Sequence, residues 1–346
     1  MREKNIQEEI CQFGKFGLIQ KLSTKFTSQQ TSTFAGIAED ASVVKDGKKY
    51  SLFSSKLFVE KIHFDLTYFP LKHLGYKCVG VTLSDILGMN VIPTQIRVNI
   101  GISNRFSLAA VEEFMSGIEL CCRYYHVELA GLDITSSASG LTISMTAFGE
   151  TTDKPGVVKR DSAKEKELIC VSGDLGAAYA GLILLEREKR VFEANPNEQP
   201  DLAGYDYLLE KQLKPEPRFD IVQTLEKEKI LPTSMITVNE GLASALIQLC
   251  TQSKVGCTIY ENKLPIDILT FNTLKELKIV ATTVALNGGE DYELLFTIKQ
   301  EDYEKIQKIE TVSVIGYIHE ESAGKNLITN DECLVELKAQ GFGENQ

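Results

Sequence analysis

Two adjacent carboxylates, Glu290 and Asp291, come directly after a glycine pair and directly before an apolar run, within residues 286–296. Glycine permits a positive φ and lets the backbone approach a ligand closely, and acids that leave such a turn can meet a cationic or metal-bound partner. A tight turn whose acids are merely solvated has the same spacing. From the residues alone, a ligand-facing turn and a solvated turn therefore both stay open.

Residues 286–296 resemble the substrate-side motif of the thiamine-monophosphate kinases, which belong to the larger family of aminoimidazole-ribonucleotide-synthetase-like ATP enzymes. Four further stretches resemble the same family in the same order: residues 63–77, Ser84 with Asp85, residues 171–178 and residues 337–342. The resemblance covers nearly the whole chain. The chain is therefore identified as a member of this family.

The resemblance implies both a fold and a reaction. The fold is a two-domain α/β architecture with an N-terminal ATP-binding domain and a C-terminal α/β domain. The N-terminal domain would pair with its copy in a homodimer, with ATP between the domain and the partner. The reaction would convert ATP and thiamine monophosphate into ADP and thiamine diphosphate by direct in-line transfer.

Phosphoryl transfer from ATP depends on charge neutralisation, so carboxylates from distant parts of the sequence must converge on Mg²⁺. By resemblance, the metal ligands are Glu39, Asp40, Asp85, Asp133 and Glu240. Helical spacing also places Asp85 on a largely apolar face, where an unpaired carboxylate is costly to bury. A metal ion or a hydrogen-bond partner is therefore implied there, and an acid that reaches water from the helix end is the alternative.

The same resemblance implies ligand contacts outside the metal site. The residues expected to contact the nucleotide are Asp133, Arg160 and Asn239, and those expected to contact thiamine phosphate are His63, Glu290 and Phe342. Phe342 would stack on an aromatic ring, and Glu290 would meet the cationic part of the substrate. Taken singly, such residues have plainer interpretations: a core histidine, a turn acid, a tail aromatic and a solvated arginine.

Several positions depart from the family pattern, and four of them bear most on ligand binding. Lys56 and Thr237 each stand at a metal-binding aspartate, whereas Leu132 and Lys61 each stand at a glycine beside a ligand. The metal-site motifs therefore hold five carboxylates and one lysine, where the family pattern has seven carboxylates, and the local charge changes from −7 to −4. A metal cluster of the family type is not expected to assemble unchanged.

A lysine about 4 Å from a divalent ion repels it, and each unit-charge interaction at that distance is worth about 4 kcal/mol at an effective dielectric of about 20. We therefore expect fewer Mg²⁺ ions than the family pattern implies. Lysine also binds phosphate as a point charge, so Lys56 is a candidate to replace one metal ion. Two functions stay open: a thiamine-monophosphate kinase, and a catalytically impaired paralogue that binds nucleotide or thiamine phosphate.

Composition and charge exclude several other classes of protein. The chain has 346 residues, of which 43% are hydrophobic and 25% charged, as in soluble globular proteins of two domains. Its formal net charge of −11 argues against a nucleic-acid partner, whose phosphates require a basic face. No apolar run reaches the roughly 18 residues that span a bilayer, and no signal-type segment follows the charged start, so we expect a cytoplasmic protein without a membrane partner.

Hydrophobic patterning in the first half of the chain predicts the strands and helices that must position the candidate site residues. Alternating apolar residues predict half-buried strands at 96–102 and 141–147. An apolar stripe between them predicts a helix over 107–125, with Ser107 as its N-cap. A further apolar strand at 127–130 leads to a turn that carries Asp133.

A polar segment with a Pro-Gly turn signal at 150–156 marks a domain boundary. We place an ATP- and Mg²⁺-binding dimerisation domain at 1–152 and the C-terminal α/β domain at 153–346. The second domain opens with an apolar strand at 168–171, a glycine turn and a helix from about 175 to 190, with Asp174 as a possible N-cap. The turn matches neither common phosphate-loop pattern, which favours a structural role.

Overall fold

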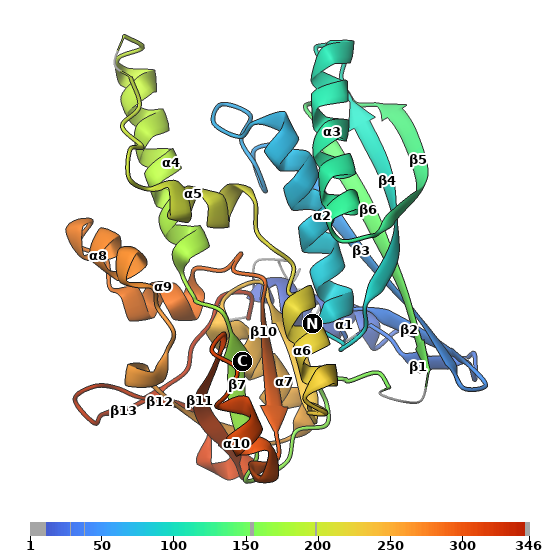
Figure 1. Ribbon diagram of the computed structural model, residues 1–346, viewed down its shortest axis with the longest axis vertical. Helices are drawn as coiled ribbons and strands as arrows, with labels where there is room; N and C mark the ends of the chain where they lie inside the picture. Colours follow the sequence, from blue (N-terminus) through green and yellow to red (C-terminus); the bar gives the residue numbers. More distant parts are fainter. Residues whose placement is uncertain (1–11, 28, 38, 153–155, 198, 343–346) are drawn as a thin grey trace, which may run out of the picture.

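The computed structural model describes residues 12–27, 29–37, 39–152, 156–197 and 199–342 (Figure 1). It contains two β-sheets, one from the first half of the chain and one from the second, with helices around and between them. The first described helix, α1 (Gly14–Ser23), precedes both sheets in the sequence. This mixed architecture confirms the expected α/β fold class.

The first sheet has six strands in the order β1-β2-β3-β6-β4-β5. Its neighbours are antiparallel except β4 and β5, which run parallel. The strands are β1 (Thr33–Ala35), β2 (Ser42–Asp46), β3 (Lys49–Val59), β4 (Pro93–Ile102), β5 (Glu128–Ser136) and β6 (Thr142–Thr152). Two helices, α2 (Leu71–Leu87) and α3 (Leu108–Tyr124), cover one face of this sheet, and the described part of the chain leaves the opposite face open (Figure 1).

Local sequence signals predict most of this half. The strands expected at 96–102 and 141–147 are confirmed as parts of β4 and β6, and the helix expected over 107–125 is α3. The Ser107 hydroxyl caps α3, because its Oγ accepts a hydrogen bond from Ala110 N at 3.2 Å. The prediction of a turn after residue 130 is wrong. β5 continues through Asp133 because its backbone pairs with β4 over that stretch.

The second sheet has seven strands in the order β13-β12-β9-β11-β7-β10-β8, and only β9 and β12 pair in parallel among the described strands. Its strands are β7 (Leu168–Ser172), β8 (Ser234–Val238), β9 (Gly256–Tyr260), β10 (Glu293–Ile298), β11 (Val312–His319), β12 (Lys325–Ile328) and β13 (Leu334–Glu336). The helices of this half are α4 (Ala177–Ala194), α5 (Asp206–Leu213), α6 (Phe219–Lys227), α7 (Leu242–Ser253), α8 (Ile268–Glu276), α9 (Ala281–Asn287) and α10 (Tyr303–Ile306). Within the described ranges, none of the helices has the length and apolar character that crossing a membrane requires.

The N-terminus of α4 differs from the expectation. Gly176, with a φ of 85°, directly precedes the helix, so Asp174 is not its N-cap. Gly176 N donates to both carboxylate oxygens of Asp291, at 3.0 and 3.1 Å. A side chain from a distant turn therefore satisfies this helix start. Asp174 instead accepts a hydrogen bond from the Tyr207 hydroxyl, at 2.6 Å.

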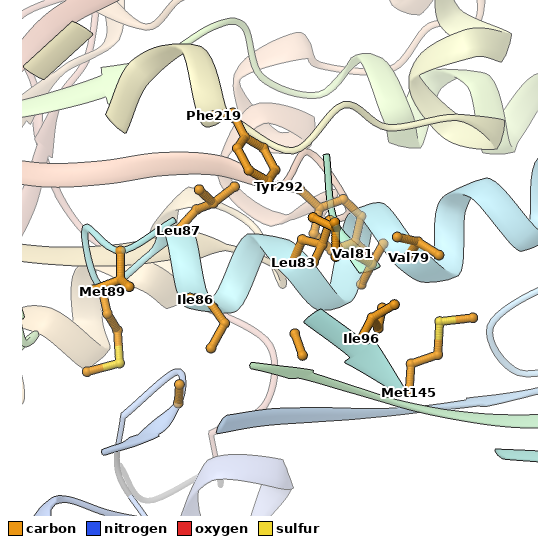
Figure 2. Packing of buried hydrophobic residues seen from close by; sticks show 14 of the residues in the cluster. Val79, Val81, Leu83, Ile86, Leu87, Met89, Ile96, Met145, Phe219 and Tyr292 are labelled. Carbon is orange, nitrogen blue, oxygen red and sulfur yellow. The ribbon is translucent and has the colours of Figure 1, made fainter. Parts of the chain in front are cut away.

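Helix α2 lies between the two halves, and all of its residues from 74 to 87 are buried. Phe219 and Tyr292 from the second half pack on one side of it, and Ile96 and Met145 from the first sheet lie on the other (Figure 2). A single hydrophobic core therefore crosses the position at which we placed the boundary. The division into domains 1–152 and 153–346 stays a prediction.

Candidate functional site

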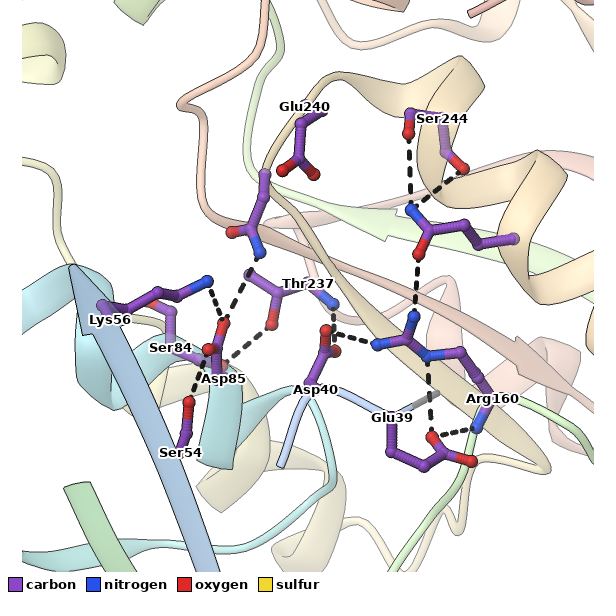
Figure 3. Close-up of polar contacts among 12 residues, drawn as sticks. Glu39, Asp40, Ser54, Lys56, Ser84, Asp85, Arg160, Thr237, Glu240 and Ser244 are labelled. Carbon is purple, nitrogen blue, oxygen red and sulfur yellow. Dashed lines mark hydrogen bonds and ion pairs between the residues drawn. The ribbon is translucent and has the colours of Figure 1, made fainter. Parts of the chain in front are cut away.

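A cleft of about 480 Å³ opens where α1, α2, β3, β8 and the second half of α7 meet. Nine residues singled out from the sequence line it: Glu39, Asp40, Lys56, Asp85, Arg160, Thr237, Asn239, Glu240 and Phe342. Figure 3 shows most of these side chains pointing toward one another from separate elements. The structure thus brings together most of the expected metal and nucleotide residues within one chain.

The period-two geometry of β3 aims Lys56 at the carboxylate of α2. Ser54 and Lys56 lie two residues apart, so they project from the same face of the strand, the face toward α2. Lys56 Nζ is 2.9 Å from Asp85 Oδ1, and Ser54 Oγ donates to Asp85 Oδ2 at 2.6 Å (Figure 3). Burial alone would lower the pKa of Lys56, but the Asp85 charge outweighs it and raises that pKa, so the ammonium stays charged. The sequence implied that Asp85 needs a metal ion or a hydrogen-bond partner, and in the structure its partners are a lysine and a serine of the same chain.

Arg160 provides the second cation of the cleft. Its Nη2 is 2.5 Å from Asp40 Oδ1, its Nε is 3.5 Å from Glu39 Oε2, and its Nη1 donates to Gln248 Oε1 at 2.8 Å. Burial raises the pKa of both Glu39 and Asp40, and the Arg160 charge opposes this rise. The expected Arg160 is therefore in the cleft, but its guanidinium binds acids of the protein.

Thr237 adds a neutral contact at the position of a family aspartate. Its backbone N donates to Asp40 Oδ2 at 3.0 Å, and its Oγ1 donates to Ser84 O at 2.9 Å. Both carboxylate oxygens of Asp40 are thus engaged, as are both oxygens of Asp85. A β-carbon on Gly88 would lie 2.3 Å from Thr237 Oγ1, so the side chain packs tightly against α2.

Helix α1 and the C-terminal segment close one side of the cleft, and sequence reasoning missed the three contacts that α1 makes there. Lys15 forms an ion pair with Glu240, and Phe16 N donates to Gly341 O at 2.8 Å. The Phe16 ring lies 5.0 Å from that of Phe342, between ring centroids. These contacts join residues more than 200 positions apart. No local spacing could indicate them.

The acids of the cleft do not fit the expected Mg²⁺ cluster. Mg²⁺ takes oxygen ligands at about 2.0 to 2.1 Å in octahedral geometry. Among the residues that the structure describes, no group of three or more His, Cys, Asp or Glu side chains is placed to hold a metal ion. The oxygens of Asp40 and Asp85 are already within hydrogen-bond distance of donors from the protein.

Asp133 lies apart from the other expected ligands. It projects from β5, is exposed, and lines a separate hollow in the first sheet together with Asn99, Thr135 and Ser144. Leu132, the neighbouring altered position, is also exposed. Within a single chain, the expected set of five carboxylates is therefore not assembled.

On the acceptor side, Glu290 is held by two donors from the core. Lys77 Nζ on α2 lies 3.1 Å from its Oε2, and Gln212 Nε2 on α5 lies 2.9 Å from the same oxygen. Burial would raise the pKa of Glu290, but the Lys77 charge outweighs it and lowers that pKa. Glu290 has a φ of 62°, a left-handed conformation that is strained for a residue with a side chain and is often found at functional sites.

The neighbouring acid points elsewhere. Asp291 is 8% exposed, and its carboxylate accepts from Gly176 N at the start of α4. Burial raises the pKa of Asp291 well above its ordinary value. A solvated turn is therefore wrong for Asp291, and Glu290 and Asp291 do not form one carboxylate pair.

His63 lies in the connection between β3 and α2. Val59 N donates to its Nδ1 at 3.0 Å, which leaves the proton of the neutral ring on Nε2. Burial lowers the pKa of His63, although the nearby Glu290 opposes this effect. Lys61, at a family glycine position, has a φ of 70°, so it adopts a glycine-like backbone conformation and pairs with Asp65 at 2.7 Å.

Comparison with known protein families and sequences gives consistent matches. Residues 38–151 match the family model described as AIR synthase related protein, N-terminal domain. A thiamine-monophosphate kinase of Buchnera aphidicola subsp. Schizaphis graminum is 31% identical over 337 residues, which are 96% of this chain and 98% of that protein. A thiamine-monophosphate kinase of Bacillus subtilis (strain 168) is 29% identical over 335 residues, 95% of this chain and 98% of that protein.

Solved structures share the fold. A structure of AaThiL complexed with AMPPCP and TMP superposes with a TM-score of 0.82 at 24% identity, and the match covers 98% of this chain and 99% of that chain. The thiamine monophosphate kinase from Aquifex aeolicus has a TM-score of 0.76 at 25% identity, over 92% of this chain and 98% of that chain.

Proposed function

The chain belongs to the thiamine-monophosphate kinase family, and on this premise we propose that it transfers a phosphoryl group from ATP to thiamine monophosphate. The products are ADP and thiamine diphosphate. The observation that carries the proposal is the acceptor side, where Glu290 takes a strained backbone conformation and has a buried lysine as its counter-ion. The charge of Glu290 also acts on His63, which supports placing both residues at one substrate site.

We assign thiamine monophosphate to His63, Glu290 and Phe342. Lys77 and Gln212 both donate to Oε2 of Glu290, whereas Oε1 accepts a long hydrogen bond from the Tyr292 hydroxyl at 3.5 Å, and we assign Oε1 to the ligand. Because Lys77 already neutralises Glu290, the carboxylate serves chiefly as a hydrogen-bond acceptor, and less as a counter-ion to the cationic ring. The Phe342 ring, already paired with another aromatic ring, offers a stacking surface for a heteroaromatic ring.

We assign the nucleotide to the cleft between α1 and α7, with Arg160 and Asn239 among its contacts. Charge that develops on the transferred phosphoryl group must be stabilised by positioned cations. In this cleft, Lys56 and Arg160 are those cations. Asp133 can join this site only from a second copy of the chain.

The open face of the first sheet supports a homodimer. Three large apolar side chains on this face are exposed: Val44 (40%), Phe53 (42%) and Leu57 (58%). Exposed apolar surface of this kind marks interaction sites on otherwise soluble proteins. We propose that this face meets the same face of a second chain, beside Asp133.

One observation favours a second function, in which the chain binds nucleotide or thiamine phosphate with little turnover. Lys56 is only 2.9 Å from Asp85, so a cation stands where phosphoryl transfer in the family is expected to use metal-binding acids. Loss of metal chemistry with retention of the acceptor side would leave a binding protein.

A turnover assay distinguishes the two functions. The wild type and the double variant Lys56→Asp, Thr237→Asp are given ATP, Mg²⁺ and thiamine monophosphate, and thiamine diphosphate is measured. Turnover by the wild type at a rate equal to that of the double variant supports the kinase. Turnover by the double variant alone supports the binding protein. Lys49→Asp is the control, because it changes the same charge on the same strand at an exposed position.

A further inference from the structure

Four carboxylates and three cations of the protein meet in the cleft, and they come from different elements. The acids are Glu39, Asp40, Asp85 and Glu240, and the cations are Lys15, Lys56 and Arg160. All four acids pair with one of these cations. Converging acids usually indicate a metal site, but here the protein supplies the positive charge itself.

We propose that Lys56, together with Arg160, supplies in this cleft the positive charge that divalent metal ions would otherwise supply, so that the cleft binds the polyphosphate of a nucleotide without requiring Mg²⁺. The identity of the ligand rests on the proposed function. The replacement of the metal rests on the geometry of the charges alone.

The first step is the state of Asp85. Its side chain is 5% exposed, and both of its oxygens are occupied, one by Lys56 Nζ at 2.9 Å and the other by Ser54 Oγ at 2.6 Å. A metal ion on either oxygen would have to displace one of these donors. It would also meet the ammonium of Lys56 at close range, where two like charges repel strongly inside a protein. Asp85 is therefore unavailable to a metal.

The second step concerns the guanidinium group of Arg160. The guanidinium is rigid and planar, and it presents five donors in a fixed arrangement. Two of its nitrogens donate hydrogen bonds to Asp40 and Gln248, its Nε lies 3.5 Å from Glu39 without a hydrogen bond, and the arginine is 5% exposed. Arginine cannot lose its proton in a protein, so this positive charge is permanent.

The third step is Thr237. A carboxylate at this position would stand beside Asp40, because Thr237 N already touches Asp40 Oδ2 at 3.0 Å. The threonine gives no charge, so the acid beside it needs no second cation. Lys56 and Thr237 thus change together: one adds positive charge and the other omits negative charge. The resulting cluster has a net charge of about −1 before any ion binds.

The fourth step concerns the ligand. Lysine and arginine are the side chains that bind phosphate, lysine as a point charge and arginine with its fork. Lys56 is 25% exposed at its side chain and lines the cleft, so its ammonium is accessible to a ligand. A polyphosphate that enters the cleft would therefore compete with Asp85 for Lys56. The exchange leaves Asp85 with its bond to Ser54.

Two titrations test the replacement, and both use the full chain. Mn²⁺ binding is followed by electron paramagnetic resonance, and ATP binding is followed by calorimetry in EDTA and in Mg²⁺. For the wild type we expect no Mn²⁺ site, and a dissociation constant for ATP that changes by less than about threefold between EDTA and Mg²⁺. For Lys56→Asp, Thr237→Asp we expect a new Mn²⁺ site and ATP binding that weakens at least about tenfold in EDTA.

The outcomes separate the inference from the proposed function. A wild-type Mn²⁺ site, or a wild-type loss of about tenfold in ATP affinity in EDTA, would overturn the replacement. A wild type that binds neither ATP nor thiamine monophosphate would refute the proposed function, whereas the Mn²⁺ titration would still decide whether a metal site exists.

Two further variants guard against misfolding and against a general effect of charge. Lys56→Gln removes the charge but keeps a polar side chain that is only one atom shorter, and we expect it to weaken ATP binding in EDTA by about tenfold. Unchanged ATP affinity in Lys56→Gln would contradict the role of Lys56. Lys49→Asp on the same strand serves as the control and should bind ATP as the wild type does.

Discussion

Lys77 on α2 and Glu290 before β10 form an ion pair across the two halves of the chain, with Nζ 3.1 Å from Oε2. The lysine side chain is 3% exposed and the glutamate side chain 30%. Lys77 Nζ also donates to Gln212 O at 2.9 Å, so it holds α5 and the glutamate turn together. The acceptor side of the site is therefore fixed to α2 from within the core.

Lys77→Met should destabilise the protein and weaken its binding of thiamine monophosphate. Without the lysine, Glu290 and the Gln212 carbonyl lose a buried donor, and we expect the free energy of unfolding to fall by about 2 kcal/mol. Urea unfolding and calorimetry measure the two effects. Lys72→Met, at an exposed position of the same helix, should change stability by less than about 0.5 kcal/mol. A Lys77→Met variant with wild-type affinity would show that the pair does not position Glu290.

The charge of Asp65 should make the stability of the protein depend on pH. Burial raises the pKa of Asp65, but hydrogen bonds from Lys189 and Lys61 outweigh it and hold that pKa well below its usual range. An acid whose pKa is lowered by folding stabilises the folded state at pH values above its unfolded pKa, which is near 4. This stabilisation is lost as the pH falls through the folded pKa. Asp65→Asn should therefore cost about 2 kcal/mol at pH 7 and progressively less below about pH 4.

Urea unfolding of wild type and Asp65→Asn at several pH values measures this difference, with Asp46→Asn on the exposed part of β2 as the control. A constant difference between pH 7 and the acid range would mean that Asp65 contributes through packing and not through its charge.

The aromatic pair between α1 and the C-terminal segment should contribute to substrate binding. Phe16→Leu and Phe342→Leu each remove one ring of a pair whose centroids are 5.0 Å apart. Aromatic pairs contribute about 0.5 to 1.5 kcal/mol, so we expect thiamine monophosphate to bind about three- to tenfold more weakly in either variant. Calorimetry measures the affinity. Phe26→Leu, at a position 71% exposed, should bind as the wild type does, and equal affinities in all three variants would exclude the pair from the site.

The open face of the first sheet should control oligomeric state. A charge on Phe53 or Leu57, which are 42% and 58% exposed, would be costly to bury against a second chain. Phe53→Glu and Leu57→Glu should therefore run as monomers in size-exclusion chromatography with light scattering, at concentrations where the wild type runs as a dimer. Leu334→Glu on β13, at a position 65% exposed, should leave the dimer intact. Unchanged mass in the first two variants would place the interface elsewhere.

Features set by short-range signals could be predicted from the sequence. Period-two alternation identifies β4 and β6, and the Ser107 hydroxyl marks the start of α3, because each signal needs only neighbouring residues. The prediction that Asp174 caps a helix was wrong because it depends on distant residues. The amide that it would have capped belongs to Gly176, which instead binds Asp291, 115 positions away. Competition between a local and a distant acceptor is not visible in spacing.

The candidate site shows the same limit. Motif resemblance located Asp40, Asp85 and Arg160, and the structure places all three in one cleft. Resemblance alone did not show that Arg160 binds Asp40, since a side chain's partner depends on the packing of the whole chain. Asp133 was expected among the metal ligands, but the pairing of β5 with β4 directs it to another surface.

The burial of α2 on all sides has a consequence for motion. Asp85 on the nucleotide side and Lys77 on the acceptor side are eight residues apart on this one helix, about 12 Å along its axis. A helix packed on every side cannot bend or slide without opening the core. The span between donor and acceptor on the buried part of α2 is thus set at folding.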